Sequence, residues 1–113
     1  MKQFEIWLAR LPSLPGSSVQ QGTRPVVIVS NDLANAHSPV ITVVPLTSKL
    51  GKTALPTHVF LNNRMLDRPS LALCEQILTV DKTCLTRRVS WVDKAFDRLA
   101  IRHALLVQLN MAA

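Results

Sequence analysis

The sequence predicts a mainly β protein with a C-terminal helix, and three observations lead to this prediction. Short runs of strand-forming residues alternate with stretches rich in proline, glycine, serine and asparagine through most of the chain. Beyond residue 90 the hydrophobic period changes from that of a strand to that of a helix. The chain has 113 residues, of which 48% are hydrophobic, so it can bury a core. We therefore expect five or so short antiparallel strands, closed by one helix, in a small barrel.

The first two strands are expected on either side of a long polar loop. Residues 4–11, FEIWLARL, are typical of a strand, whereas the prolines and glycines of residues 12–22 disfavour a helix. Residues 25–32, PVVIVSND, begin with a β-branched run that indicates a strand buried on both faces. Pro25 can begin a strand, but it has no backbone N–H to donate to the hydrogen bonds of a central strand. Arg24 therefore places a permanent charge at the rim of an apolar core. That is an unusual position for an arginine whose only role is to keep the surface soluble.

The middle of the chain predicts two further strands. Residues 33–39 form a connector with room for one helical turn, and residues 40–48 a third strand. Pro45 near the end of that strand indicates an edge or a bulge. A basic loop over residues 49–56 then leads to a fourth strand over residues 57–62.

The last third of the chain changes from strand to helix. Residues 70–80 predict a fifth strand, bent so that two short strands result, and residues 81–85 a tight turn or a 3₁₀ piece. Ser90 with Asp93 three places on forms a capping box that predicts the start of an amphipathic helix. The apolar residues expected on its buried face are Val92, Phe96, Leu99, Leu106 and Val107.

Composition favours a polyanionic partner. Thirteen lysines and arginines stand against seven acidic residues, so the formal charge is +6, and nucleic acid is the commonest partner of a small basic domain. No secretory signal or membrane-spanning stretch is recognisable in the sequence. Cys74 and Cys84 form no CxxC pair and each lies in an apolar stretch, so we expect a cytoplasmic protein with reduced, packed thiols.

Several common sites are not expected. The GKT at residues 51–53 is no phosphate-binding loop, because Leu46 stands where that motif needs a glycine. The three histidines are far apart and no HExxH motif or Cys/His cluster occurs, so no zinc site is expected. We expect neither a metal ion nor a cofactor.

Four blocks of sequence, in this order, resemble the MazF/PemK family of toxins from type II toxin–antitoxin pairs. They are GSSVQQGTRPVVIVSND, SPVITVVPLTS, LPTHVFL and LALCEQILTVDKTCL, and the likeness extends over a single domain at residues 1–113. The resemblance implies an SH3-like barrel of the CcdB/MazF toxin type that forms a homodimer. It implies an endoribonuclease that cuts single-stranded RNA, often mRNA, at short sequences without a metal. It also implies a cognate MazE-like antitoxin whose acidic, flexible tail occupies the RNA groove.

The resemblance assigns the catalytic roles to two residues. The arginine of the family's G-x-R-P motif is Arg24, and the threonine of its P-L-T-S block is Thr47. Metal-free RNA cleavage uses the neighbouring 2′-hydroxyl as nucleophile, and the protein must neutralise the phosphorane and move two protons. A guanidinium fork suits the first task, because it pairs with two phosphate oxygens and keeps its charge.

Further residues are expected to bind RNA. Gln76 matches a family glutamine associated with base recognition, and an amide can make paired contacts to a base edge. Gly22 would let the backbone approach a phosphate closely. The other expected contacts, from the two loops, are Ser18, Gln20, Gln21, Lys49 and Lys52.

The general base stays open. Many relatives carry a glutamate in the loop before the motif, where this chain has Val19. Glu75, a hydroxyl group or solvent organised by Arg24 are the candidates. Two other functions also stay open: a CcdB-like poison of gyrase on the same barrel, and an inactive homologue that only binds RNA or an antitoxin.

Overall fold

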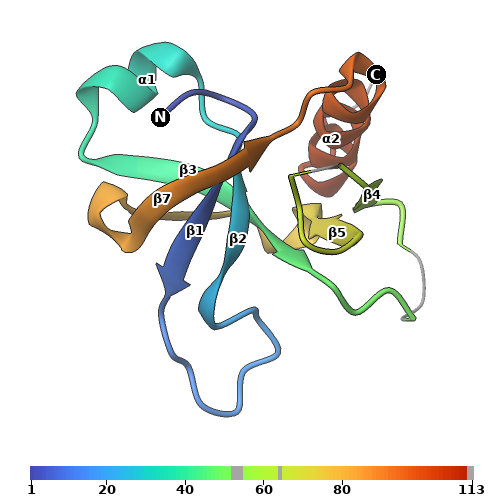
Figure 1. The fold of residues 1–113 in the computed structure, drawn as a ribbon, viewed down its shortest axis with the longest axis horizontal. Helices are drawn as coiled ribbons and strands as arrows, with labels where there is room; N and C mark the ends of the chain where they lie inside the picture. Colours follow the sequence, from blue (N-terminus) through green and yellow to red (C-terminus); the bar gives the residue numbers. More distant parts are fainter. Residues whose placement is uncertain (52–54, 64, 112–113) are drawn as a thin grey trace.

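The computed structural model describes residues 1–51, 55–63 and 65–111, and Figure 1 shows its fold. Within these ranges the chain forms a seven-stranded sheet, two α-helices and two 3₁₀ turns. In chain order the elements are β1 (Glu5–Leu11), β2 (Gly22–Ile28), α1 (Asp32–His37), β3 (Val40–Thr47), β4 (His58–Leu61), β5 (Ser70–Leu73), η1 (Cys74–Gln76), β6 (Leu78–Asp81), η2 (Lys82–Cys84), β7 (Leu85–Trp91) and α2 (Ala95–Gln108).

The strands pair antiparallel in the order β4-β5-β3-β2-β1-β7, and β6 pairs with β3. β3 is shared among three partners, because its first half pairs with β6 while Leu46 and Thr47 pair with β5. β2 joins β3 only from Val26 to Ile28. Pro45 lies where β3 changes from one partner to the next, so the missing N–H falls at an irregular point of the sheet.

Two apolar clusters form the core. On β2, Val27 packs into one cluster, and Val26 and Ile28 pack into the other. All three side chains are fully buried, as expected for a strand covered on both faces, and each such burial is worth roughly 1.5–3 kcal/mol. The alternation along β2 therefore holds the two halves of the core together.

Most of the expected elements are present, with corrections at three places. The connector is the short helix α1, the fifth strand is bent at η1 into β5 and β6, and residues 82–84 form the expected 3₁₀ turn. The second strand covers residues 22–28 rather than 25–32. The reason is that β2 begins by pairing with β1 alone, where the missing N–H of Pro25 interrupts no bond to β3.

The predicted capping box is wrong. Ser90 is buried in β7, a strand that the sequence did not predict, and its hydroxyl donates to Asn63 Oδ1 at 3.2 Å. α2 begins only at Ala95, and Lys94 at its N-cap makes no side-chain capping bond. β7 was missed because it carries two adjacent arginines in its centre, where alternation alone predicts no strand.

The predicted buried face of the helix is also wrong. α2 turns Ile101 and Ala104 to the core and packs over β4 and η1 at one end of the sheet (Figure 1). Phe96 and Leu99 are 81% and 64% exposed, and Val92 is buried but precedes the helix. Apolar residues occur on two faces of α2, so periodicity could not decide which of them meets the core. Among the described residues, no helix is both long and apolar enough to cross a membrane.

Both cysteines are free thiols, as expected. Cys74 is fully buried, and burial together with the nearby Glu75 charge raises the pKa of its thiol to about 12. A thiol in that environment stays protonated and packs as a small apolar side chain.

Candidate active site

Arg24 lies in β2, held by bonds to the loop that precedes the strand. Its Nε donates to the carbonyl of Gln21 at 2.8 Å, and a terminal nitrogen donates to the side-chain oxygen of Gln20. These bonds fix the guanidinium, yet a guanidinium has five N–H donors and can still face an anion with the others. The side chain is half-buried, so its position is set by the fold.

The loop reaches Arg24 through a sharp turn of the backbone at Gly22. Its φ of 76° lies in the left-handed region, which a residue with a Cβ adopts at a cost. Gly22 is opposite Leu11 at the end of the β1–β2 pairing, so the turn closes the hairpin two residues before Arg24. Gly22 itself does not line the cavities described below.

The opposite wall is provided by Thr47, at the point where β3 leaves β2. Continuing the β2–β3 register beyond the Val26–Pro45 pair would set Arg24 opposite Thr47, but that pairing ends there, and Thr47 pairs with β5 on the other side of β3. The two strands therefore diverge, and a cavity of about 220 Å³ opens between them. Its lining residues are Val19, Gln20, Gln21, Arg24, Thr47 and Lys49. Thr47 is only 9% exposed, and its Oγ1 accepts the backbone N–H of Lys49 at 3.2 Å.

A second cavity of about 510 Å³ continues from the first one. It shares Gln20, Thr47 and Lys49 with the first cavity and adds Ser18 and Gln76. The Oε1 of Gln76 accepts the backbone N–H of Gln20 at 2.7 Å, which ties the η1 turn to the loop before β2. Of the nine residues expected from the sequence, seven line one or both cavities, namely Ser18, Gln20, Gln21, Arg24, Thr47, Lys49 and Gln76. Lys52 lies outside the described residues.

Glu75 and His58 also line the second cavity. His58 Nε2 and Glu75 Oε2 are 2.9 Å apart, and Thr57 Oγ1 donates to the other carboxylate oxygen at 3.1 Å. The Nδ1 atom of His58 is buried and has no hydrogen-bond partner among the described residues. Glu75 was named from the sequence as a candidate base, but its contact with His58 could not be predicted, because it depends on the β4–β5 register that brings residues 58 and 75 to one end of the sheet.

The arrangement suits a phosphodiester. A fixed guanidinium and a hydroxyl face one cavity, amide side chains and a lysine border it, and a carboxylate lies in the adjoining cavity. In the part of the chain that the structure describes, no three His, Cys, Asp or Glu side chains are grouped so that they could hold a metal ion.

Comparisons with known proteins agree on one family. The family described as PemK-like, MazF-like toxin of type II toxin–antitoxin system matches residues 2–107. The endoribonuclease MazF of Staphylococcus saprophyticus is 38% identical over 114 aligned positions, which cover 98% of this chain and 92% of that protein.

Solved structures share the fold. MazF from Deinococcus radiodurans superposes with a TM-score of 0.81 at 19% identity, over 98% of this chain and 97% of that one. A mycobacterial endoribonuclease, solved in complex with its cognate antitoxin, gives a TM-score of 0.80 at 22% identity and covers 100% of this chain and 98% of that one. The mainly antiparallel sheet with a C-terminal helix is thus the fold of MazF structures.

Proposed function

Because the chain belongs to the PemK-like, MazF-like toxins of type II toxin–antitoxin systems and is a homologue of the endoribonuclease MazF, we propose that it cuts single-stranded RNA, chiefly mRNA, at short specific sequences without a metal ion. The observation that carries this proposal is the cavity where β2 and β3 diverge, with Arg24 on one wall and Thr47 on the other. The proposed reaction is carried out by one domain over residues 1–113, in the cytoplasm where mRNA is available.

In the proposed reaction the 2′-oxygen attacks phosphorus and the bond to the 5′-oxygen breaks. The products are a 2′,3′-cyclic phosphate and a free 5′-hydroxyl, with one proton leaving the 2′-hydroxyl and one reaching the 5′-oxygen. Arg24 neutralises the charge that develops on the equatorial phosphoryl oxygens. Thr47 donates a hydrogen bond from its hydroxyl to the same phosphate or passes a proton to the leaving oxygen.

Glu75 is the candidate for the general base that the geometry supports best. Of the described residues that line the two adjoining cavities, Glu75 alone carries a carboxylate. It lines the second cavity together with Thr47. Hydrogen bonds from Thr57 and His58 hold the carboxylate in one orientation. Since Val19 stands where many relatives have a loop glutamate, a base on η1 would keep this chain active.

The remaining cavity residues are proposed to bind RNA. The amides of Gln20 and Gln76 can pair with base edges, and Ser18, Gln21 and Lys49 can contact sugar and phosphate. Gly22 is proposed to let the backbone pass close to a phosphate, and Lys52 to attract the strand by charge.

Two protein partners are proposed. A MazE-like antitoxin with an acidic tail would complement the net charge of +6, and a related endoribonuclease has been solved with its cognate antitoxin. A homodimer is supported by the α2 stripe, by which we mean the exposed apolar side chains of Phe96, Leu99 and Val107 on one face of the helix.

The function is tested with purified protein and mixed-sequence RNA in excess EDTA. We expect cleavage to give 5′-hydroxyl ends at a defined short sequence, found by mapping the ends. Arg24→Ala and Thr47→Val should each lower the rate ~10²–10³-fold, whereas Arg102→Ala, which removes an exposed charge on α2, should leave it unchanged.

Three results would contradict the proposal. Cleavage that requires an added metal ion would exclude the metal-free mechanism. RNA that is bound but never cut would make the chain an inactive homologue. Growth arrest by Arg24→Ala equal to wild type would favour a protein target such as gyrase.

A further inference from the structure

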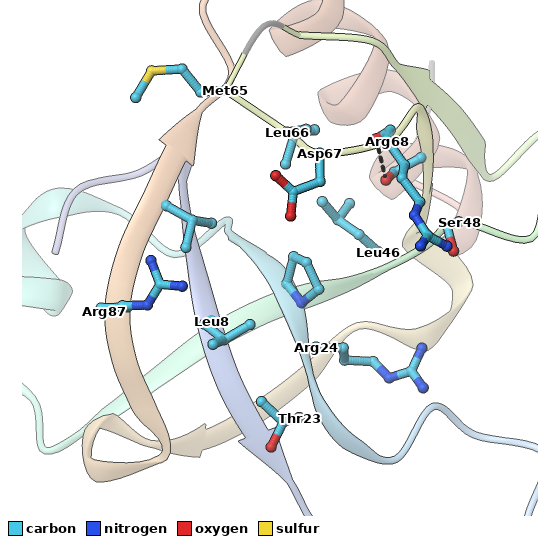
Figure 2. A pocket seen from close by; sticks show the side chains of 13 residues that line it. Leu8, Thr23, Arg24, Leu46, Ser48, Met65, Leu66, Asp67, Arg68 and Arg87 are labelled. Atoms are coloured by element: carbon cyan, nitrogen blue, oxygen red, sulfur yellow. Dashed lines mark hydrogen bonds between the residues drawn. The ribbon is translucent and has the colours of Figure 1, made fainter.

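Arg24 lines another cavity, which the proposed catalytic residues otherwise leave unused. It has a volume of about 510 Å³, and Arg24 is the one residue it shares with the cavity of Thr47. Figure 2 shows this cavity between β7, β1, β2 and the segment that leads into β5. We call it the arginine cavity, after Arg24, Arg68 and Arg87 in its lining.

Strand pairing explains how Arg87 enters the arginine cavity. Arg87 pairs with Leu8 across the β1–β7 register, and both residues line the cavity together with Val89. Arg88, the next residue along β7, is instead 3.3 Å from Glu5 Oε2. The side chains of the two adjacent arginines therefore lie in different environments, and that of Arg87 projects from β7 into the cavity (Figure 2).

The second arginine comes from the turn before β5. The carbonyl of Arg68 accepts a hydrogen bond from the Ser70 hydroxyl at 3.1 Å, and Ser70 is buried at the start of β5. In the view of Figure 2, the apolar side chains of Leu8 and Leu46 lie between Arg87 and Arg68. The cavity thus combines an apolar floor with cations on separate walls.

Its charge is unbalanced. Three arginines face one carboxylate, that of Asp67, and within the described ranges neither Arg68 nor Arg87 takes part in an ion pair. Both side chains are exposed, so they are accessible to an anion. Guanidinium groups bind phosphate oxygens in pairs, and an apolar floor suits the face of a nucleobase. The carboxylate of Asp67 can only accept hydrogen bonds, so it favours a base edge with two adjacent N–H donors, as guanine presents, over edges that mix donors with acceptors.

We propose that the arginine cavity holds a nucleotide of the RNA strand that flanks the nucleotide being cut. The inference rests on the proposed function, since Arg24 is the link between this cavity and that of Thr47. Arg68 and Arg87 bind the flanking phosphate, the base lies on the floor, and Asp67 favours guanine, whose edge offers the carboxylate two adjacent N–H donors. The contact adds affinity and a further position of sequence preference without taking part in the chemical step.

The test uses RNA oligonucleotides with a 2′-deoxy sugar at the mapped cut site, which bind without being cleaved. Arg68→Gln and Arg87→Gln should each raise the dissociation constant roughly tenfold and lower the slope of log affinity against log salt by about one. Arg88→Gln is the matched control, since it removes the same charge one residue away, outside the cavity lining. Oligonucleotides trimmed of the flanking nucleotides should bind the wild type and both variants alike.

Cleavage kinetics give a second readout. With full-length RNA both variants should raise KM and leave kcat within about twofold of wild type, because the contact lies outside the reacting atoms. Asp67→Asn should change the preferred base at one flanking position. Thermal unfolding checks that each variant folds, and Arg87→Lys is used in place of Arg87→Gln if the Gln variant does not fold.

Three outcomes would overturn the inference. Wild-type affinity in both arginine variants would show that the cavity binds no RNA, and normal cleavage of full-length RNA by the wild type would leave the proposed function standing. A change in sedimentation toward monomer, with unchanged RNA affinity, would make the cavity a contact with a second copy of the chain. Absence of both binding and cleavage by the wild type would reject the proposed function together with this inference.

Discussion

At the scale of single residues, the carboxylate of Glu75 decides how the proposed proton transfers are arranged. Glu75→Gln keeps the size of the side chain and its contact with Thr57 but removes the proton acceptor. We expect kcat to fall ~10²–10⁴-fold, as for the loss of a general base, with little change in KM. Single-turnover cleavage and thermal unfolding measure the two effects, and Asp93→Asn, at an exposed carboxylate outside both cavities, is the control. Wild-type kcat in the Gln variant would leave a hydroxyl or solvent as the base.

The individual cavity residues were accessible to sequence reasoning to different degrees. Arg24 and Thr47 stand in motif blocks, so each could be singled out from the sequence without knowledge of its neighbours. Arg87 could not, and neither could the contact of His58 with Glu75, because both depend on strand pairing between separate segments of the chain. A motif can thus identify a chemical group, whereas register decides which groups share a cavity.

At the scale of elements, the start of β2 depends on the backbone of Gly22. Gly22→Ala should lower the free energy of unfolding by about 1–2 kcal/mol, because an alanine is strained at a φ of 76°. A Cβ at Gly22 would meet no atom within 4 Å, so the cost is conformational rather than steric. Gly51→Ala is the control, since that position is equally open and is not in the left-handed region. Equal unfolding midpoints in urea for the two variants would contradict this account.

Glu5 connects β1 to β7 and makes their pairing sensitive to acid. Partial burial alone would raise the pKa of the Glu5 carboxyl, but hydrogen bonds from Trp7, the Lys2 backbone and Arg88 outweigh it and lower the pKa below 4.5. The folded state therefore binds this proton less readily than the unfolded state. The stabilisation is complete above pH 4.5 and is lost as the pH falls through the lower folded-state value.

The corresponding prediction concerns unfolding in acid. Glu5→Gln should lower stability at pH 7 and flatten its decline below pH 4.5, as measured by urea unfolding at a series of pH values. Asp97→Asn, in the first turn of α2, provides a carboxylate control. A decline as steep in the Glu5 variant as in wild type would show that other carboxyl groups control it.

Local patterns predicted the elements to different extents. The buried run of β2 and the bend between β5 and β6 were predictable, because β-branched residues and a break in pattern are local signals. β7 was not predictable, because Arg87 and Arg88 interrupt the alternation of polar and apolar residues. Arg87 lines the arginine cavity and Arg88 pairs with Glu5, and neither contact can be read from the local sequence. The buried face of α2 was misassigned because the helix carries a second apolar face, the α2 stripe.

At the scale of the whole molecule, the α2 stripe predicts self-association. Leu99→Ser or Phe96→Ser should shift the protein from dimer toward monomer, because each removes an apolar side chain that is 64% or 81% exposed in the single chain. Sedimentation velocity over a range of concentrations measures the shift, and Arg102→Ser on the same helix should have no effect. A wild-type protein that sediments as a monomer at every concentration would reject the homodimer.

The divergence of β2 from β3 limits how such an enzyme can change its target sequence during evolution. The hydroxyl and the guanidinium are attached to strands that also carry the core, so moving either group would mean rebuilding the sheet. Residues 18–21 and 49–51 contribute no side chain to the buried core, although they border the same opening and Gln20 helps to hold Arg24. Lineages that retain this fold are therefore expected to keep their chemistry fixed and to diversify their preferred cleavage sites through substitutions in those two segments and at the proposed base contacts Gln76 and Asp67.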